Sequence, residues 1–419
     1  MKFVNVLFVV LLYCTHLSAQ VTLPNNLYFT HIGVEDGLCQ NTVCCILQDH
    51  LGFIWLGTKD GLTRYDGYRF RVFKHDAADP MSIGNNFIRV LYEDADGLIW
   101  IGTNVGVYIY NPETENFRKF DVATERGDVI SREVSSIKCD SSGDLWIGVN
   151  WQGVFRYDRR DESLELYEPV PGDTTSLSSV HVWDLCFDGD GNLWVGSQNG
   201  GLDRYDRETD RFVRHRLKGL SDVSRIVLDK QNQLLLGTMK DGLFSFNPYM
   251  GTCQPLLLDS GHKDLFVRAI FVRNSREVVV GTENGIYIYD CVTRKTRHVN
   301  QELGNPYSLS CKAVYSIYCD KEGALWIGTY FGGVNYLPPS SSLIFDKFYP
   351  IGHSDRLSGK AVREFVRDES GIIWIGTEDQ GLNRFDPVSG KFTHYNSRNS
   401  GLSCDNVHGL CVDGDRLYI

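Results

Sequence analysis

Short apolar stretches separated by turn residues run along almost the whole chain. From Tyr28 onward, apolar and polar positions alternate within each stretch, and the stretches end at Gly, Asp or Asn. Alternation with a period of two predicts half-buried β-strands, and no segment keeps the 3.6-residue period of an amphipathic helix. The pattern therefore predicts an all-β protein.

One motif recurs along the chain, with Trp-Ile-Gly-Thr as its fullest core. Copies that keep the tryptophan are at 53–58, 98–103, 144–148, 192–196, 324–329 and 372–377. Two copies without it are at 234–238 and 278–282, and a further copy begins at 417–419. The motif glycines are about 46 residues apart, a spacing typical of β-propeller blades. They are Gly57, Gly102, Gly148, Gly196, Gly237, Gly281, Gly328 and Gly376.

Each repeat predicts four antiparallel strands. An aliphatic strand ends at an Asp-x-x-Gly turn, as at 49–52 and 140–143, and the tryptophan strand follows. A second glycine-containing hairpin leads to a Leu-x-Arg-Tyr-Asp strand, as at 154–158 and 202–206, and then to a weaker fourth strand. Asp caps such turns and Gly supplies their positive φ, which Asn232 also tolerates in the fifth repeat. Because a lone sheet of this kind leaves both faces uncovered, we expect the sheets to stack radially as a β-propeller.

The start of the chain indicates how the ring closes. Tyr28 to Ile32 has the frame of a fourth strand that precedes the first strand of blade 1, and 345–348 has the same frame. An orphan fourth strand can complete the last blade and remove the open edges. We therefore predict a seven-bladed propeller at 21–342, closed between Tyr28 and about Pro339. Residues 343–419 are predicted to start a second propeller and to be the least stable part.

The first twenty residues differ from the rest. Lys2 is followed by an apolar run from Phe3 to Tyr13, and Ala19 offers a small residue at a cleavage point. This run is shorter than the roughly 20 residues of a membrane span and is typical of a secretory signal peptide. We therefore interpret residues 1–20 as a signal peptide and expect an exported protein.

Export makes the cysteines informative. Without Cys14, eleven cysteines remain, and Cys139, Cys319 and Cys411 recur at one position of the repeat, too far apart to pair with each other. We interpret the cysteines as small buried apolar residues, with one or two disulfides among the rest as the alternative. No spacing typical of a zinc site occurs in the sequence, so no metal or cofactor is expected.

Composition and motifs limit the function classes. The 42 Lys and Arg against 53 Asp and Glu give a net charge of −11, which disfavours general binding to nucleic acid or an anionic membrane. The sequence has no phosphate-binding loop, His-Glu-x-x-His or Gly-x-Ser-x-Gly motif. Most acidic residues occupy repeated turn positions, including Asp188 and Asp190, which resemble part of a calcium loop. We therefore expect no enzyme activity in this chain.

Candidate ligand-binding residues are found where the repeats differ from one another. The position after the constant aliphatic residue of the first strand varies from blade to blade, as Cys44, Arg89, Ser135, Trp183, Ser224, Arg268 and Tyr315. Strand alternation directs this position away from the packed side, toward the mouth of the central channel. The second hairpin lies on the same rim and adds Trp151, Tyr330 and Phe331.

These positions favour a sugar ligand. Flat aromatic faces suit sugar rings, and Arg binds hydroxyl, carboxylate or sulfate groups. We expect the two arginines to indicate a ligand with negative charge and Trp151 to lie beside Trp183. The alternative is that individual aromatics plug the channel or pack between blades. The predicted ligand-binding residues are Arg89, Trp151, Trp183, Arg268, Tyr315, Tyr330 and Phe331.

The sequence resembles a known family. The stretch His-Ile-Gly-Val-Glu-Asp-Gly-Leu at 31–38, the Trp-Ile-Gly-Thr copies and the Arg-Tyr-Asp strands are similar to two-component regulator propeller repeats. The resemblance covers residues 28–419 and implies the periplasmic sensor region of a hybrid two-component system from gut Bacteroidetes. In that family two propellers precede an immunoglobulin-like domain, a membrane helix, a histidine kinase, a receiver and a DNA-binding region.

The resemblance also implies a ligand and partners. It implies an oligosaccharide from a complex polysaccharide as ligand, a histidine kinase and membrane anchor only in a C-terminal part missing from this sequence, and a possible homodimer of the full-length receptor. Two other classes stay open: an exported propeller enzyme acting on polysaccharide, as a lyase or glycosidase, and a protein-interaction scaffold. A sensor should release its glycan unchanged, an enzyme should turn it over, and a scaffold should ignore it.

Overall fold

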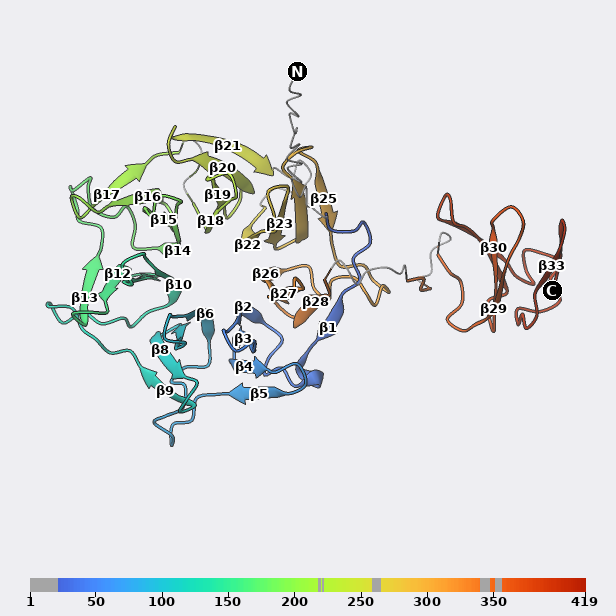
Figure 1. The fold of residues 1–419 in the computed structure, drawn as a ribbon, viewed down its shortest axis with the longest axis horizontal. Coiled ribbons are helices and arrows are strands. Elements are labelled where there is room, and N and C mark those ends of the chain that lie inside the picture. The colour runs from blue at the N-terminus through green and yellow to red at the C-terminus, as the bar shows by residue number, and fades with distance from the viewer. Residues whose placement is uncertain (1–21, 218–219, 221, 258–264, 340–346, 351–355) are drawn as a thin grey trace, which may run out of the picture.

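The described strands form a ring of seven sheets and a separate C-terminal unit (Figure 1). The computed structural model describes residues 22–217, 220, 222–257, 265–339, 347–350 and 356–419. These residues contain no α-helix; the 3₁₀ helix η1 (Val34–Asp36) follows the first strand. The predicted all-β, seven-bladed propeller is confirmed. The predicted signal peptide lies outside the described residues.

Each blade is a four-stranded antiparallel sheet, and in blades 1 to 6 the strands follow chain order from the centre outward. Blades 1 and 2 consist of β2 (Val43–Gln48), β3 (Ile54–Thr58), β4 (Gly61–Tyr65), β5 (Phe70–Phe73), then β6 (Ile88–Glu93), β7 (Ile99–Thr103), β8 (Gly106–Asn111) and β9 (Asn116–Lys119). Blades 3 and 4 consist of β10 (Val134–Cys139), β11 (Leu145–Val149), β12 (Gly153–Asp158), β13 (Ser163–Tyr167), then β14 (Val182–Phe187), β15 (Leu193–Ser197), β16 (Gly201–Asp206) and β17 (Arg211–His215).

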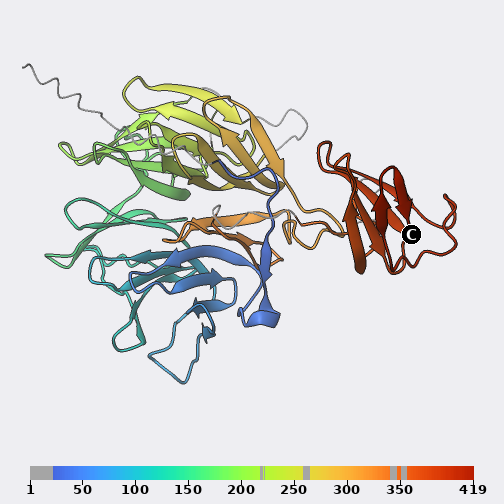
Figure 2. The same cartoon turned by 45° about the vertical axis from the view of Figure 1, so that its right-hand side comes forward.

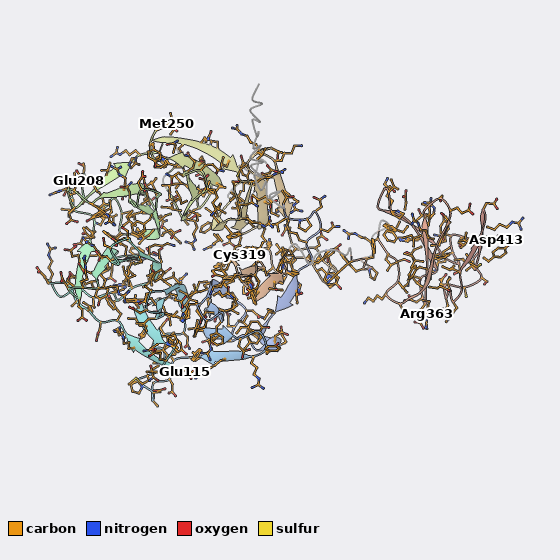
Figure 3. The ribbon with its side chains drawn as sticks, viewed as in Figure 1. Glu115, Glu208, Met250, Cys319, Arg363 and Asp413 are labelled. Carbon is orange, nitrogen blue, oxygen red and sulfur yellow. The ribbon has the colours of Figure 1, made fainter. Side chains whose placement is uncertain are left out.

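Blades 5 and 6 consist of β18 (Arg225–Leu228), β19 (Leu234–Gly237), β20 (Leu243–Asn247), β21 (Thr252–Leu257), then β22 (Val267–Val272), β23 (Glu277–Thr282), β24 (Gly285–Asp290) and β25 (Thr296–Val299). Blade 7 consists of β26 (Val314–Cys319), β27 (Leu325–Thr329), β28 (Val334–Leu337) and β1 (Thr30–Ile32). The turns between third and fourth strands lie on the outer circumference, where Figure 3 labels Glu115, Glu208 and Met250.

The ring closes through its N-terminal strand. β1 pairs antiparallel with β28, with Thr30 opposite Tyr336 and Ile32 opposite Val334. The last blade thus takes its outer strand from the start of the chain, as the sequence predicted. This pairing ties the two ends of the ring together and gives blade 7 a fourth strand, as in the other six blades.

The C-terminal unit lies beside the ring (Figure 2). It contains a four-stranded blade of the same kind, made of β29 (Val362–Arg367), β30 (Ile373–Thr377), β31 (Leu382–Asp386) and β32 (Lys391–Tyr395). A two-stranded sheet of β33 (Cys411–Asp413) and β34 (Arg416–Tyr418) follows it. The predicted strand at 345–348 falls partly outside the described residues, and its described part, Lys347 and Phe348, is not in a strand. The boundary at 342 also falls outside them and stays a prediction.

The repeated tryptophan is tied to the turn of its own blade. In blade 1 the Trp55 indole Nε1 donates to Asp49 Oδ2 at 2.7 Å, while Asp49 Oδ1 accepts the Phe53 backbone N–H at 2.9 Å. The same indole–carboxylate bond is present in blades 2, 3, 4 and 7 at 2.8–3.1 Å. The buried tryptophan therefore keeps its N–H satisfied and fixes the first hairpin of the blade.

The motif glycine lets neighbouring blades approach each other. A Cβ placed on Gly102 would lie 2.4 Å from Val90 Cγ1 and 2.6 Å from Val134 Cγ1 of the following blade. Gly281 meets Val314 in the same way, and across the closing seam Gly328 meets Val43. The constant aliphatic residue of each first strand is thus packed on the preceding blade, as the sequence predicted.

The eleven cysteines at 39–411 are free thiols in the structure. Six of them pack against the apolar clusters between blades, in agreement with their interpretation as small apolar residues. They are Cys45, Cys139, Cys186, Cys253, Cys291 and Cys319.

We expect Gly102→Ala to destabilise the ring, because the added methyl group has no room between blades 2 and 3. The loss should be about 1–3 kcal/mol, as for overpacking elsewhere. Gly401→Ala is the control, since nothing lies within 4 Å of a Cβ at Gly401. Chemical unfolding followed by tryptophan fluorescence would measure both; equal stability of the two variants would contradict the packing role.

A buried carboxylate in blade 4 generates a second prediction. Asp203 Oδ2 accepts the Ser178 backbone N–H at 2.9 Å and the Ser178 hydroxyl at 2.6 Å, whereas Oδ1 has no partner among the described residues. Burial raises the pKa of Asp203 to about 6. In blade 7 the equivalent residue is Asn335, which accepts the Ser310 N–H and donates to its hydroxyl.

We expect Asp203→Asn to stabilise the protein at pH 7.5 by about 1–3 kcal/mol. Because the folded-state pKa is raised, Asp203 lowers the stability progressively as the pH rises from about 4 to about 6. The difference in unfolding free energy between variant and wild type should therefore grow across this window and stay constant above it. Urea unfolding at a series of pH values tests this, and a difference independent of pH would contradict it.

Candidate ligand-binding site

A bulge in the first strand aims one side chain per blade at the channel mouth. In blade 1 Val43 pairs with Thr58 and Cys45 with Gly57, so Cys44 is an extra residue on its strand. Such a bulge redirects the side chain of the extra residue while its neighbour stays in the ladder. The bulge recurs in blades 2, 3, 4, 6 and 7, whose extra residues are Arg89, Ser135, Trp183, Arg268 and Tyr315. The first strands are the innermost of the ring (Figure 1).

Blade 5 departs from this pattern. β18 begins at Arg225, and Ser224, the expected rim residue, is 2% exposed and donates its hydroxyl to the Val267 carbonyl at 2.8 Å. Arg225 takes the place instead: its Nε donates to the Arg268 carbonyl at 2.7 Å. Burial lowers the pKa of Arg225, and Asp184 opposes this effect. The sequence did not reveal this change, because Val223 to Asp229 has the same spacing as in the bulged blades.

Two blades place an arginine on a phenylalanine in the same way. The Arg268 guanidinium lies 3.9 Å from the Phe266 ring centre and 4.5 Å from that of Tyr315, and it pairs with Glu283 at 2.6 Å. The Arg89 guanidinium lies 4.1 Å from the Phe87 ring centre, and it pairs with Glu133 at 3.1 Å. Both arginines are therefore held by a ring on one side and a carboxylate on the other.

Aromatic rings join the two arginines around one part of the mouth. Tyr315 and Tyr330 are stacked at 5.1 Å, and Tyr330 contacts Phe331, which is 70% exposed, at 4.2 Å. The Lys59 ammonium lies 4.2 Å from the Tyr330 ring and 5.6 Å from the Phe87 ring. We call this set the mouth cluster: Lys59, Phe87, Arg89, Trp183, Arg225, Phe266, Arg268, Tyr315, Tyr330 and Phe331.

Trp183 joins the mouth cluster through Phe266, with ring centres 6.5 Å apart. Its Nε1 is buried and has no hydrogen-bond partner among the described residues. An unpaired buried donor costs free energy, so this indole N–H needs an acceptor, which either a bound water or a ligand oxygen would supply.

Trp151 lies apart from these rings. It is 66% exposed, its φ is 70°, and its ring contact is with His181 at 4.0 Å. The expected contact between Trp151 and Trp183 is not among the ring contacts of the described residues; Trp151 reaches blade 4 through His181. Of the seven predicted residues, the structure therefore links six and leaves Trp151 at the periphery.

The mouth is cationic although the protein is acidic. Arg89, Arg225 and Arg268, together with Lys59, face only two ion-paired carboxylates, Glu133 and Glu283. At its base, burial raises the pKa of the Cys44 thiol to about 11, and Arg89, Lys59 and Arg268 counteract this shift. Lys59, Phe87 and Phe266 flank the variable positions and were not predicted. The Phe-x-Arg pattern shared by blades 2 and 6 was a signal for the two phenylalanines.

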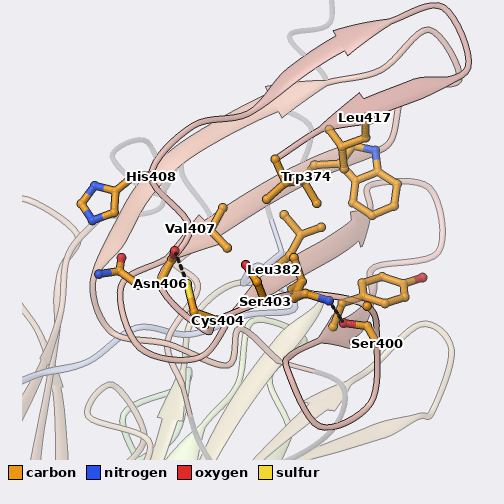
Figure 4. Close-up of a pocket in the computed structure, with 13 residues that line it drawn as sticks. Trp374, Leu382, Ser400, Ser403, Cys404, Asn406, Val407, His408 and Leu417 are labelled. Atoms are coloured by element: carbon orange, nitrogen blue, oxygen red, sulfur yellow. Dashed lines mark hydrogen bonds between the residues drawn. The ribbon is translucent and has the colours of Figure 1, made fainter.

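A cavity in the C-terminal unit has a packing explanation. It measures about 630 Å³ and is lined by Trp374, Leu382, Val407 and Leu417 (Figure 4). In the ring the motif tryptophan contacts an aromatic from the third strand of the next blade, as Trp146 contacts Tyr205 at 4.7 Å. The cavity beside Trp374 occupies the equivalent place, so we do not assign it to a ligand.

Comparison with known proteins identifies the class. The family model "Two component regulator propeller" matches residues 37–60, 82–105, 176–199 and 308–331. The extracellular domain of the putative hybrid two component system BT3049 from B. thetaiotaomicron is 28% identical, with a TM-score of 0.74 over 88% of this chain and 49% of that chain. The chain therefore carries repeats that match the two-component regulator propeller family and is similar in fold and sequence to the extracellular domain of a putative hybrid two-component system.

Two further similar proteins show how much of the chain such matches cover. Histidine kinase P4 from Formosa agariphila is 39% identical over 59 residues, which are 14% of this chain and 4% of that protein. A streptogramin B lyase shares the fold at 14% identity, with a TM-score of 0.54 over 74% of this chain and 97% of that chain. The chain therefore spans about half of the solved sensor domain and a small part of the kinase, and the fold also occurs in an enzyme. Within the described residues, no helix is long and apolar enough to cross a bilayer.

Proposed function

We propose that the ring is the periplasmic ligand-sensing part of a hybrid two-component system and binds an oligosaccharide over the mouth cluster. The observation that carries this proposal is the buried, unpartnered Nε1 of Trp183 beside an arc of aromatic rings and arginines. Sugar hydroxyls accept from such a donor, and sugar ring faces stack on exposed aromatics. The relation to an extracellular sensor domain supports the periplasmic location, with residues 1–20 as the export signal.

The charge of the mouth selects among glycans. Arg89 and Arg268 are fixed by aromatic and carboxylate neighbours, so they are preorganised to bind a carboxylate or sulfate group. A neutral glycan would use only the aromatic faces and hydroxyl acceptors. The proposed ligand is therefore an oligosaccharide with acidic groups, and in the full-length protein its binding would control the histidine kinase.

The mouth is better suited to binding than to hydrolysis. Glu133 and Glu283, the carboxylates that form ion pairs with Arg89 and Arg268 of the mouth cluster, come from blades 3 and 6. A glycosidase needs two carboxylates facing one bond, one of them as proton donor. We therefore propose that the glycan is released unchanged.

The C-terminal unit supports a second ring. Gly376 approaches Val407 as the ring glycines approach the next blade, with 2.8 Å between a Gly376 Cβ and Val407 Cγ1. Val362, the equivalent of the fully buried Val43, is 45% exposed, and Phe365 is 72% exposed. These residues present the surface on which a preceding blade packs in the ring, so we propose that 356–419 begin a second propeller.

We expect Trp183→Ala and Arg268→Ala each to weaken binding of an acidic oligosaccharide by about 10- to 100-fold, since each removes a direct contact. Thermal unfolding should stay close to wild type, because both side chains border the channel rather than an interblade cluster. The measurement is calorimetric titration against a panel of acidic and neutral oligosaccharides.

The control is Trp151→Ala, which removes a peripheral ring and should have a smaller effect. Unchanged affinity in the Trp183 and Arg268 variants would contradict a site at the mouth, and cleavage of the glycan during the titration would favour the enzyme class. Stronger binding of neutral glycans would contradict the acidic ligand.

We also expect limited proteolysis to cut within 343–419 before it cuts the ring. A sheet edge and the apolar side chains Val362 and Phe365 are exposed in that unit. Mass spectrometry of the first fragments would locate the cut, and initial cleavage inside the seven blades would contradict the expectation.

A further inference from the structure

A second cavity lies on the outside of the ring, at the seam where blade 7 meets blade 1. It measures about 670 Å³ and is bordered by β1, η1, the ends of β4 and β5, and the first turn of blade 7. We call it the seam cavity. It is far from the channel in the topology, since β1 and β5 are the outermost strands of their blades.

The walls of the seam cavity are aromatic. Tyr65 and Phe70 are stacked at 4.4 Å, Tyr65 lies 6.0 Å from Trp326, and Trp326 lies 4.9 Å from Tyr336. Tyr68 stands at the entrance and is 93% exposed. Aromatic faces of this kind attract either apolar groups or cations.

The charges that line it are acidic. Asp36, Asp320 and Glu322 border the cavity, and no Lys or Arg does. Glu322 has no hydrogen bond or ion pair within the part of the chain that the structure describes, and Asp320 Oδ2 accepts only the Trp326 indole N–H, at 2.8 Å. Carboxylates beside aromatic faces select a cation over a neutral group.

Other seams of the same ring show what fits this place. In blade 4 Arg207, two residues after Tyr205, reaches back to blade 3 and binds the turn residue Asp140 at 2.8 Å. In blade 3 Arg159, two residues after Tyr157, likewise lies 3.3 Å from Asp94 of blade 2. Both guanidinium groups bind the carboxylate oxygen that also holds the motif tryptophan.

The seam between blades 7 and 1 has the same aspartate, tryptophan and tyrosine but lacks the arginine. Asp320, Trp326 and Tyr65 are the equivalents of Asp140, Trp146 and Tyr205, and the residue two positions after Tyr65 is Gly67. Gly67 has no side chain to fill the space, and nothing lies within 4 Å of a Cβ placed on it. The seam cavity therefore corresponds to the position that Arg159 fills in blade 3 and Arg207 fills in blade 4, and it is open to solvent.

We infer that the seam cavity binds a ligand that carries a guanidinium group. The planar cation would pair with Asp320 and Glu322 while one face lies against Tyr65, and the rest of the ligand would extend past Tyr68. The chemistry is the same for a free guanidine compound and for an arginine side chain of a partner protein. This site is separate from the mouth cluster in position and opposite to it in charge.

The test is calorimetric titration of the whole chain with three probes: capped arginine (N-acetyl-arginine amide), agmatine, and capped citrulline as the uncharged isostere. We expect both cations to bind and citrulline to bind at least about tenfold more weakly, because it lacks the charge that the carboxylates require. Tighter binding of capped arginine than agmatine would identify a protein side chain as the source, and the reverse order a free guanidine compound. Equal binding of citrulline, or no binding of either cation at millimolar concentration, would overturn the inference.

Variants locate the binding. Glu322→Gln should lower the affinity for the bound cation about three- to tenfold, and Tyr68→Ala should lower it as well; neither should shift thermal unfolding, because Glu322 has no partner among the described residues and Tyr68 is exposed. The matched control is Asp96→Asn, at the position in blade 2 that corresponds to Glu322, where Arg159 already fills the seam. A loss in the control equal to that in Glu322→Gln, or no loss in Glu322→Gln and Tyr68→Ala, would overturn the location.

Discussion

The bond between the motif tryptophan and the turn aspartate determines how this protein is built. One carboxylate caps the first hairpin with one oxygen and holds the buried indole N–H with the other, so local turn geometry and interblade packing depend on the same residue. The indole then presents its face to the following blade, and the glycine two residues later lets that blade come close. Every blade that keeps these three residues is thereby fixed in the same orientation to its neighbour.

This constraint leaves other positions free to differ, and the candidate sites are at such positions. In six of the seven blades the bulge in the first strand places one unpaired residue at the channel mouth, so its identity can change without disturbing the ladder. The residue two positions after the third-strand tyrosine is similarly free, and it is an arginine in blades 3 and 4 and Gly67 in blade 1. Both proposed sites therefore use positions that vary from blade to blade around a repeated frame.

The sequence was sufficient for the fold because each repeated residue has one structural use. The motif Trp and Gly, the turn Asp and the orphan strand at 28–32 predict blades, their contact and their closure, and the structure confirms all of these. The mouth was only partly predictable. Arg225 takes the place expected of Ser224 because the Ser224 hydroxyl turns to the Val267 carbonyl of blade 6, a change that the spacing of the sequence does not show. The shared Phe-x-Arg pattern was the signal for Phe87 and Phe266, whereas Lys59 is recognised only from its position over the Tyr330 ring.

The two proposed sites also explain how an acidic chain can bind an acidic ligand. Its net charge of −11 would repel a polyanion from most of the surface. The mouth cluster places four cations beside three carboxylates, Glu133 and Glu283 in ion pairs and Asp184 near Arg225, so attraction is confined to the channel mouth. At the closing seam the arrangement is reversed, because Gly67 removes the arginine that covers the turn aspartate in blades 3 and 4. The same frame thus presents a cationic centre and an acidic outer seam, and charge alone would keep the two ligands on separate sites.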